Sequence, residues 1–428
     1  MLYNIYMSRT LPLMADMPYH SGIEMRAYMS YKQRRLCAVN FGASRFVYNR
    51  MVALGKERYE LKKVSIYCEP VAERLSYVES VLSDLKYFQN SIPFLDSEDI
   101  DAQTIANARQ NYHKAWNNFK KNPASGIPVF HKKRYDGSYQ TNAHYYKDAK
   151  CMADCNVRFI NNHHLLVPKL GVVKISGSPK RIKELMTRTS PTRIGTVTVR
   201  VDPVGRYFIS LQLGSVDPFA DMLPSTGSMR GYDVNLENFM TDSDGNVVDN
   251  LRFKRTEQDK LSKAQHKLSR MYEHAKQDSR SIYTSKNYQR QRRKVALMHS
   301  HIAARRDDFL HVLSKREVES QDFLFYEDLR VKNMVRNHKL AYAISDVSWG
   351  IFHNYLSYKS AIYGKTCLKV PAAHTSQTCS ECGYVLQGSE NLTLKDRGWI
   401  CPACGYHHMR DHNSAKVILA RGMASLGL

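Results

Sequence analysis

Hydrophobic periodicity divides the first half of the chain into a helical part and a strand-rich part. Residues 22–31 alternate apolar and polar positions, which predicts one short strand. From about residue 34 to residue 121 apolar positions recur at helical spacing, so we expect mainly helices there. Residues 157–213 contain short apolar runs separated by turn residues, and this pattern predicts several short strands and a small β-barrel.

The second half of the chain has a different pattern. Residues 214–228, rich in Pro, Ser, Gly and Asp, are expected to be a linker. Residues 229–241 read as one strand, and residues 251–320 keep apolar side chains at helical spacing, which predicts a long helical hairpin. A buried strand from Phe323 is expected to end at Glu327. Together the two halves predict a multi-domain α+β protein.

Positive charge sets this chain apart from an ordinary globular protein. It has 63 Lys and Arg against 40 Asp and Glu, a formal net charge of +23, and residues 251–320 alone hold 18 basic and 8 acidic residues. Such an excess favours a polyanionic partner, and 27 tyrosines supply rings that could stack on bases. We expect nucleic acid and no membrane, because the sequence has no run of eighteen apolar residues and no evident basic amphipathic terminal helix. A basic surface that only maintains solubility is the alternative.

Four of the nine cysteines have the spacing of a zinc ribbon. Two C-x-x-C pairs are separated by eighteen residues, and a glycine follows each pair; the cysteines are Cys379, Cys382, Cys401 and Cys404. Four thiolates leave zinc no open position for water, so one structural Zn²⁺ is expected, and the chemistry must lie elsewhere. The odd number of cysteines indicates a reducing compartment, and we expect a cytosolic protein.

Two other motif-like stretches carry less weight. Residues 364–366 resemble the end of a phosphate-binding loop, but position 359 is lysine where that loop requires glycine. Cys151 and Cys155, with His163 and His164, could ligate a second metal ion. Their spacing is looser than that of the C-x-x-C pairs, so they predict a metal site less strongly.

Three carboxylates stand where a metal site could form. Asp233 lies within a predicted strand, Glu327 at a strand end, and Asp411 at the start of the final helix. Each alone could be an exposed strand acid, a turn residue or a helix cap. Together, in a basic chain with a zinc ribbon, they predict a ribonuclease-H-like site that holds two Mg²⁺ ions about 4 Å apart, one to activate water and one to stabilise the leaving 3′ oxygen. Hard Mg²⁺ selects oxygen ligands and zinc selects thiolates, so the two sites should not interfere.

Amide, basic and aromatic side chains mark candidate nucleic-acid contacts. Residues 101–121 form a predicted helix with closely spaced amides, which suit polar base edges, although a solvated helix face is the alternative. Residues 123–148 interleave cations with tyrosines, as contacts along a phosphate backbone and stacking on bases require. The segment could also be a plain linker. The candidates are Arg45, Asn49, Gln103, Asn107, Lys132, Lys133, Arg134, Tyr139, Arg330 and Lys332.

Several motifs in a fixed order point to one family. They are Gly-Tyr-Asp at residues 231–233, Tyr-Glu-Asp-Leu at 326–329, Thr-Ser-Gln-Thr-Cys at 375–379 and Arg-Asp-x-Asn at 410–413. In this arrangement the chain resembles the TnpB family, the RNA-guided nucleases of bacterial and archaeal transposons from which type V CRISPR effectors descend. The similarity covers about residues 22–420. Asn235 stands where the family often has Gly, and Ser414 and Val417 replace the usual Ala and Asn, which affects fine geometry and removes no carboxylate.

The resemblance implies a function and its partners. It implies a Mg²⁺-dependent, RNA-guided endonuclease that cuts double-stranded DNA beside a short adjacent motif, in the bacterial or archaeal cytoplasm at the nucleoid. Asp233, Glu327 and Asp411 would hold two Mg²⁺ ions in a RuvC-like domain. Guide RNA and target DNA would be the partners, with one protein per RNA expected and a dimer left open. Gln103, Asn107 and residues 138–144 are candidates for reading the adjacent motif.

The resemblance also implies a division into domains. A wedge β-barrel would be formed by the first strand and a later segment, with a helical recognition lobe inserted between them, and the nuclease domain would contain the zinc ribbon. The implied bounds are an N-terminal extension at 1–21, with Met25 a conceivable alternative start, the first wedge strand at 22–35, the recognition lobe at 36–125, the wedge barrel at 126–213, a linker at 214–228, the RuvC-like domain at 229–370, the zinc ribbon at 371–409 and a final helix at 410–428.

Three alternatives stay open on the sequence alone. A compact type V CRISPR effector would have the same chemistry and take its guide from a repeat–spacer array. An RNA-guided regulator that binds without cutting would be marked by loss of one of the three acids, and all three are present. A zinc-ribbon DNA-binding factor without a guide would leave the acids and the recognition-like helices unexplained.

Overall fold

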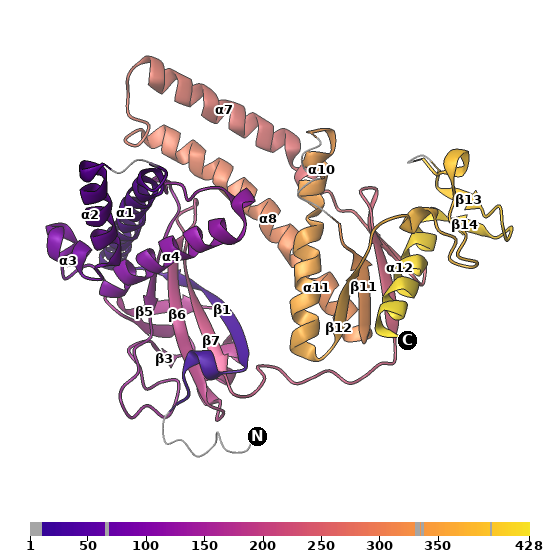
Figure 1. Cartoon of the computed structure of the whole chain (residues 1–428), viewed down its shortest axis with the longest axis horizontal. Helices are drawn as coiled ribbons and strands as arrows, with labels where there is room; N and C mark the ends of the chain where they lie inside the picture. Colours follow the sequence, from indigo (N-terminus) through magenta and orange to yellow (C-terminus); the bar gives the residue numbers. More distant parts are fainter. Residues whose placement is uncertain (1–10, 65–67, 330–333, 335–337, 394–395) are drawn as a thin grey trace. The chain divides into compact units, whose positions relative to one another are not determined.

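The computed structural model describes residues 11–64, 68–329, 334, 338–393 and 396–428 (Figure 1). Contacts divide the chain into two compact units, Met1–Phe219 and Ala220–Leu428. The division falls between residues 219 and 220, inside the segment that composition predicts as a linker. Within the described residues, no helix is long and apolar enough to span a membrane.

The first unit is built on a seven-stranded antiparallel sheet with the order β2-β6-β7-β1-β5-β4-β3. Its central strand β1 pairs with β7 on one side and with β5 on the other. Alternate residues Ile23, Met25 and Ala27 of β1 are buried in the core. The strands are β1 (Tyr19–Tyr28), β2 (Gly137–Asn142), β3 (Arg158–Asn161), β4 (His164–Val167), β5 (Gly171–Ser176), β6 (Thr192–Val201) and β7 (Tyr207–Ser215).

β1 begins and ends three residues before the strand that the sequence predicts. Ser30 caps the following helix: its Oγ accepts a hydrogen bond from Gln33 N at 3.3 Å, and Gln33 Oε1 accepts one from Ser30 N at 2.9 Å. This capping box commits the chain to a helix from Tyr31 onward, so the strand cannot continue to that residue. Tyr19 extends β1 at its start, because its backbone pairs with Ser215 of β7.

Helices of the first unit form a second core beside the sheet. α1 and α4 pack through buried side chains that include Val47, Met51, Tyr112 and Trp116. α2 adds Val78 to the same cluster. The helices and 3-10 turns are η2 (Met14–Asp16), α1 (Tyr31–Leu61), α2 (Glu69–Ser83), α3 (Tyr87–Ser91), η3 (Pro93–Asp96), α4 (Ala102–Lys121), η4 (Pro123–Ser125) and α5 (Pro179–Thr187).

The second unit contains a five-stranded mixed sheet with the order β10-β9-β8-β11-β12. β11 runs parallel to both β8 and β12, whereas β9 is antiparallel to β8 and β10. The strands are β8 (Met229–Val234), β9 (Asn238–Asp242), β10 (Val247–Asp249), β11 (Phe323–Glu327) and β12 (Thr366–Val370). The ribbon region adds η5 (Thr375–Gln377), η6 (Gly388–Glu390), β13 (Gly398–Ile400) and β14 (His407–Met409).

The prediction of one strand over residues 229–241 is wrong, because the chain folds back within it. β8 ends at Val234 and β9 begins at Asn238. The side chain of Asn235 makes the turn, since its Oδ1 accepts a hydrogen bond from Asn238 N at 2.8 Å. The turn places β9 antiparallel to β8 at the sheet's centre.

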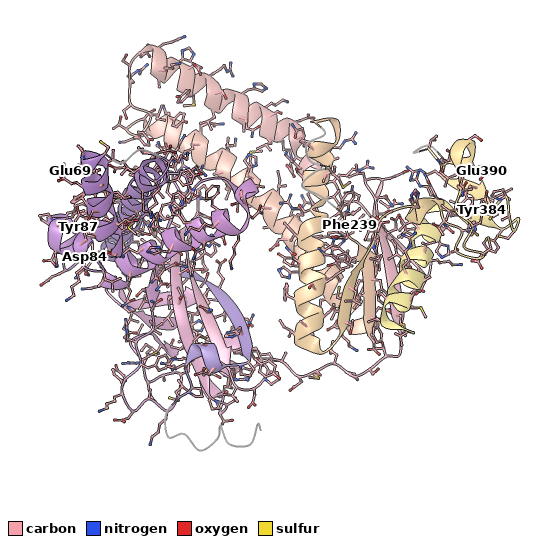
Figure 2. All side chains as sticks on the ribbon, in the orientation of Figure 1. Glu69, Asp84, Tyr87, Phe239, Tyr384 and Glu390 are labelled. Carbon is pink, nitrogen blue, oxygen red and sulfur yellow. The ribbon has the colours of Figure 1, made fainter. Side chains whose placement is uncertain are left out.

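Helices cover both faces of this sheet (Figure 1). On one face, Leu324 of β11 joins a core with residues of α8 and α11. Phe239 of β9, which is labelled in Figure 2, lies on this face. Its ring contacts those of Phe309 and Phe352 edge-on, with centroids 5.3 and 5.1 Å away. On the other face, Phe325 packs with residues of β12 and α12. The helices are α6 (Phe253–Thr256), α7 (Gln258–Gln277), α8 (Lys286–Ser320), α10 (His338–Val347), α11 (Trp349–Tyr363) and α12 (Arg410–Leu426).

The hairpin of α7 and α8 has one apolar side. Leu261 and Ala264 of α7 pack against Val295 and Ile302 of α8. Basic side chains of both helices lie exposed, among them Lys263, Lys267, Arg270, Arg293 and Lys294. This surface has the charge that binding a phosphate backbone requires.

Candidate active site and metal centre

Two of the three candidate acids lie at the ends of neighbouring parallel strands. Glu327 is the last residue of β11 and is buried. Asp233 is the next-to-last residue of β8, so it lies near the strand's end and not in its middle as expected. Because Tyr326 pairs with Tyr232, the two acids occupy adjacent positions on parallel strands. The carboxyl ends of parallel strands are where ligand sites form in sheets of this kind.

The third acid reaches this edge because α12 lies very close to β8. Asp411 is in the first turn of α12. Further along the helix, a Cβ on Gly231 of β8 would lie only 2.6 Å from the backbone N of Leu419. Only glycine therefore allows this approach, which brings the start of α12 to the sheet edge that carries Asp233.

The electrostatics of Asp233 depend on the other two carboxylates. Burial raises the pKa of Asp233 well above its ordinary value, and the negative charges of Glu327 and Asp411 raise it further, against the effect of Arg410. Burial also raises the pKa of Glu327, although Thr375 and Arg421 oppose the shift. Acidic groups held in such surroundings would gain from a bound cation.

Asp411 is held by three neighbours from different elements. Asn235 Nδ2 donates to its Oδ2 at 3.2 Å, and Arg410 Nε donates to its Oδ1 at 3.2 Å. Arg397 Nη1 lies 3.6 Å from the same Oδ2. Asn235 therefore has two functions, because the side chain that ends β8 also orients an acid on α12.

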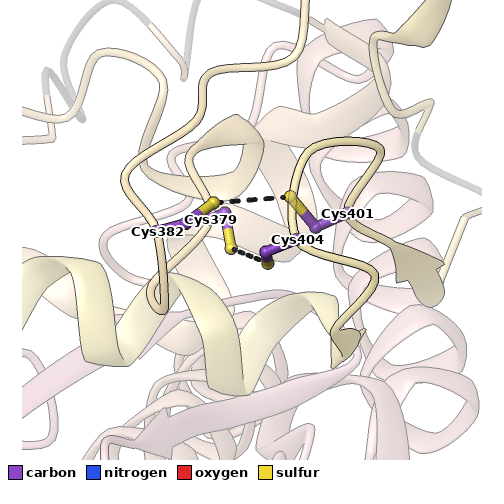
Figure 3. A group of neighbouring side chains, drawn as sticks. All are labelled: Cys379, Cys382, Cys401 and Cys404. Atoms are coloured by element: carbon purple, nitrogen blue, oxygen red, sulfur yellow. Dashed lines mark hydrogen bonds between the residues drawn. The ribbon is translucent and has the colours of Figure 1, made fainter.

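The four predicted zinc ligands gather in one place (Figure 3). Their sulfur atoms all lie within 4.8 Å of one another, with Cys379–Cys404 at 3.7 Å and Cys382–Cys401 at 3.6 Å. A tetrahedral ion with Zn–S bonds of about 2.3 Å would require sulfurs about 3.8 Å apart, so the residues fit zinc. Among the described residues this is the only such group of Cys, His, Asp or Glu side chains.

The ribbon has its own small core and backbone pattern. Each knuckle closes through a glycine, since Gly383 N donates to Cys379 O at 2.9 Å and Gly405 N donates to Cys401 O at 2.8 Å. Both glycines have positive φ, at 76° and 72°. Tyr384 also donates to Glu390 at 2.9 Å, and Figure 2 labels both residues.

Direct hydrogen bonds join the ribbon to the acid-bearing elements. The hydroxyl of Thr375, on the segment that enters the ribbon, donates to Glu327 Oε1. Asn413 of α12 is buried; its Oδ1 accepts from Ser380 N at 2.9 Å and its Nδ2 donates to Thr378 O at 2.7 Å. These two backbone groups flank Cys379. The metal centre and the carboxylates therefore belong to one connected structure.

Several predicted nucleic-acid contacts serve the fold instead. Tyr139 is 1% exposed, so the expectation that its ring stacks on a base is corrected. Asn107 is 4% exposed and its Nδ2 donates to Gln140 O at 3.2 Å, while Gln103 Oε1 accepts from Asn142 at 3.0 Å. These two amides of α4 thus form hydrogen bonds with strand β2. Neither the interpretation as base-reading groups nor that as a solvated helix face predicts this arrangement.

The remaining basic candidates lie around one cavity of the first unit. Arg45, Lys132 and Arg134 line a space of about 550 Å³ beside the stacked rings of Tyr48 and His131. Lys133 is exposed on the same segment.

The side-chain amide of Asn49 is hydrogen-bonded to the protein's own backbone. Its side chain donates to His131 O at 2.9 Å and accepts from His131 N at 2.7 Å, so it fixes the segment. Arg330 and Lys332 lie outside the described residues.

Three family models match separate parts of the chain. The model described as "Helix-turn-helix domain" matches residues 17–63, "Probable transposase" matches 221–338, and "Cas12f1-like, TNB domain" matches 349–418. In this structure residues 17–63 form β1 and the single long helix α1, with no helix-turn-helix among their described residues.

Curated relatives and solved structures match larger parts. A protein of Streptomyces pristinaespiralis named as an RNA-guided DNA endonuclease is 38% identical over 232 residues, which span 54% of this chain and 53% of that relative. InsQ of Escherichia coli (strain K12), which is also named as an RNA-guided DNA endonuclease, is 28% identical over 400 residues, covering 90% of this chain and 88% of the relative. The protein of a Cas12f1–sgRNA–target DNA complex has a similar fold, with a TM-score of 0.56 at 13% identity over 94% of this chain and 98% of that one.

Proposed function

We propose that this chain, a TnpB-like protein, is an RNA-guided endonuclease that cuts double-stranded DNA. The observation that carries the proposal is the meeting of Asp233, Glu327 and Asp411, from two parallel strands and one helix, in a basic protein. The names of the two curated relatives support the same activity. In this proposal the second unit is a RuvC-like, ribonuclease-H-type nuclease domain.

The three carboxylates would hold two Mg²⁺ ions. The donor set fits, because carboxylate oxygens are the ligands that Mg²⁺ prefers, and because burial and the negative charges of Glu327 and Asp411 raise the pKa of Asp233. When bound, the ions would activate water for in-line attack on phosphorus and stabilise the leaving 3′ oxygen.

The protein's own residues would orient this site. Asn235 and Arg410 hold the Asp411 carboxylate from two sides, and Thr375 holds Glu327. Hydrogen bonds that fix a ligating carboxylate commonly change metal affinity or activity by about 10–100-fold when they are lost. The ribbon, with one structural Zn²⁺ on its four cysteines, would position Thr375 and α12.

The rest of the molecule would hold nucleic acid. We assign the seven-stranded sheet to the wedge domain and α1 to α4 to the recognition lobe, with the exposed cations of α7 and α8 along the phosphate backbone. Guide RNA would pair with the target, while the protein reads only a short adjacent motif, in the bacterial cytoplasm with one protein per RNA.

The second candidate is a compact type V CRISPR effector. The likeness to the Cas12f1 fold and the match over residues 349–418 favour it. It would use the same carboxylates with a guide from a repeat–spacer array, so only the origin of the guide separates the two.

One experiment tests the guided activity. The protein is expressed with its native flanking DNA, washed at high salt, and the RNA that remains bound is sequenced. A discrete RNA with a variable end, and cleavage that follows the target when that end is changed, is the expected result. Random RNA fragments and no programmable cleavage would refute the proposal, and an origin in a repeat–spacer array would favour the second candidate.

A further inference from the structure

An arginine that forms no ion pair within the described residues, Arg26, lies on the central strand of the first unit's sheet. On β1, Met25 and Ala27 point into the core, so Arg26 points to the opposite face. There it pairs across the strands with Phe208 of β7, which in turn pairs with Arg200 of β6. The guanidinium of Arg26 lies 5.2 Å from the Phe208 ring centre and 5.8 Å from that of Tyr28.

Two arginines near Arg26 have carboxylate partners. Arg200 binds Glu24 through two hydrogen bonds of 2.9 and 2.6 Å, and Arg206 binds Asp202 at 2.6 Å. By contrast, Nη1 of Arg26 is buried and has no hydrogen-bond partner in the part of the chain that the structure describes. A buried, unpaired guanidinium N–H costs free energy that an incoming acceptor would recover.

Charge near Arg26 points to an anion as that acceptor. Burial lowers the pKa of Arg26, and the positive charge of Arg206 lowers it further, although Asp202 acts in the opposite direction. The local positive charge is therefore only partly balanced by the protein itself. An anion bound beside Arg26 would balance it.

Arg26 lines a cavity that combines basic and aromatic side chains with small and apolar ones. The cavity has a volume of about 740 Å³, and its polar and aromatic lining includes Arg34, Lys174, His164, Tyr28 and Tyr207. No Asp or Glu is among the described residues that line it. Tyr28 is 52% exposed, so one face of the cavity offers a ring to a ligand.

The walls of the cavity are fixed by backbone contacts. Gln33 Nε2 donates to Leu170 O at 3.0 Å and to Val172 O at 2.9 Å, which ties the start of α1 to β5. Arg34 Nε donates to Met29 O at 3.0 Å. A rigid basic cavity with an exposed ring is a preformed site for a nucleotide.

We propose that this cavity binds one unpaired nucleotide of the guide RNA, with a phosphate on Arg26 and Lys174 and the base stacked on Tyr28. The inference rests on the proposed function, because it takes the RNA partner from it. An unpaired nucleotide fits better than a base pair inside a helix, since bases within a duplex are stacked on both faces and cannot present one to Tyr28. RNA loops and bulges supply such bases, and aromatic and guanidinium groups are what they stack on.

The salt dependence of binding tests the phosphate contact. The RNA that copurifies with the wild-type protein is synthesised, and its affinity for the full-length protein is measured at several salt concentrations. We expect Arg26→Gln to weaken binding about tenfold and to lower the slope of log K against log salt by about 0.7, the value for one single-strand phosphate. Lys174→Gln, at an exposed side chain, should lower the slope in the same direction.

Arg200→Gln is the matched control. It removes the same charge from the same face and beside the same ring, but from an arginine already paired with Glu24. It should leave the slope unchanged. Equal slopes for wild type, Arg26→Gln and Lys174→Gln, in proteins with the wild-type thermal midpoint, would overturn the inference.

A fluorescent base tests the stacking contact. 2-Aminopurine is placed at successive unpaired positions of the same RNA, and quenching on binding is recorded. At one position, the wild-type protein and Tyr28→Phe should quench the 2-aminopurine fluorescence, whereas Tyr28→Leu should not. Stacking needs the ring and not the hydroxyl. Quenching that survives in Tyr28→Leu at every position would contradict the assignment of the base.

The source of the nucleotide is decided by a second binding step. Target DNA is added to the preformed protein–RNA complex of each variant. If the variants bind RNA normally and lose affinity only for the target DNA, the RNA assignment is overturned. A wild-type protein that retains no discrete RNA would refute the proposed function itself. The two failures are therefore distinguishable.

Discussion

The hydroxyl of Thr375 donates a hydrogen bond to Glu327 across 48 residues of sequence. Thr375 is buried in the segment that leads from β12 into the zinc ribbon, and Glu327 ends β11. Burial raises the pKa of Glu327 above its ordinary value, and the bond from Thr375 opposes that shift. A residue of the ribbon's approach thus helps keep a buried carboxylate charged and in place.

Thr375→Val should reduce DNA cleavage without reducing DNA binding. Valine keeps the shape and removes the donor, so we expect about a tenfold loss in cleavage rate and a higher Mg²⁺ concentration for half-maximal rate. The rate is measured in a Mg²⁺ titration with saturating guide RNA. Thr375→Ser keeps the hydroxyl and should restore most of the activity; a Ser variant as impaired as Val would contradict the role of the bond.

Removal of zinc should unfold the ribbon and then impair the acids. Four thiolates that lose their ion repel or protonate, and the clamp of Asn413 on the backbone beside Cys379 loses its support. If zinc contributes about 4 kcal/mol, the thermal midpoint should fall by roughly 8–16 °C. Differential scanning calorimetry with and without a zinc-selective chelator measures this.

Readdition of zinc supplies the control for that experiment. Zn²⁺ returned in excess over the chelator should restore both the midpoint and cleavage, whereas added Mg²⁺ should not. An unchanged midpoint after zinc loss, with zinc content verified by elemental analysis, would show that the ribbon is stable without its ion.

Asp233→Asn should stabilise the protein when no divalent metal is present. The folded-state pKa of Asp233 lies well above its ordinary value of 3.8, so its contribution to stability is present below about pH 3.8 and is lost as pH rises through the folded-state pKa. Above pH 3.8 the carboxyl group therefore opposes folding, and the neutral amide does not. We expect a midpoint several degrees higher for the variant at pH 7, at about 2–4 °C per kcal/mol.

Two conditions sharpen this prediction. The difference between variant and wild type should shrink towards pH 4, because the wild-type carboxyl is then protonated in the fold. Saturating Mg²⁺ should reverse the difference at pH 7, since the cation stabilises the charged wild type. A variant less stable than wild type in EDTA at pH 7 would mean that the carboxylate is satisfied without metal.

Much of the site could be predicted from the sequence because its chemistry is local. The C-x-x-C spacing places thiolates within one knuckle, and the four cysteines do gather. The pattern that ends a buried strand at Glu327 also corresponds to the end of β11. Such signals depend on a few neighbouring residues, so composition and periodicity can reveal them.

The contacts between distant segments could not be predicted in the same way. Asn235 bonds Asp411 across 176 residues, and the same side chain ends β8 where periodicity predicts one long strand. The amides of Gln103 and Asn107 look like base-reading groups in sequence but satisfy β2 in the fold. A polar side chain carries no local sign of which partner it will meet, so only the tertiary structure distinguishes these roles.

The most direct test of the central claim separates DNA binding from DNA cleavage in Asp233→Ala. The variant, loaded with the guide RNA, should bind matched target DNA with wild-type affinity and leave it uncut, because the carboxylate is needed for the metals and not for pairing. Asp328→Ala is the matched control: this acid is adjacent to Glu327 but exposed and paired with Lys369, so it should cut normally. Undiminished cleavage by Asp233→Ala would contradict the assignment of the three carboxylates as the site of DNA hydrolysis.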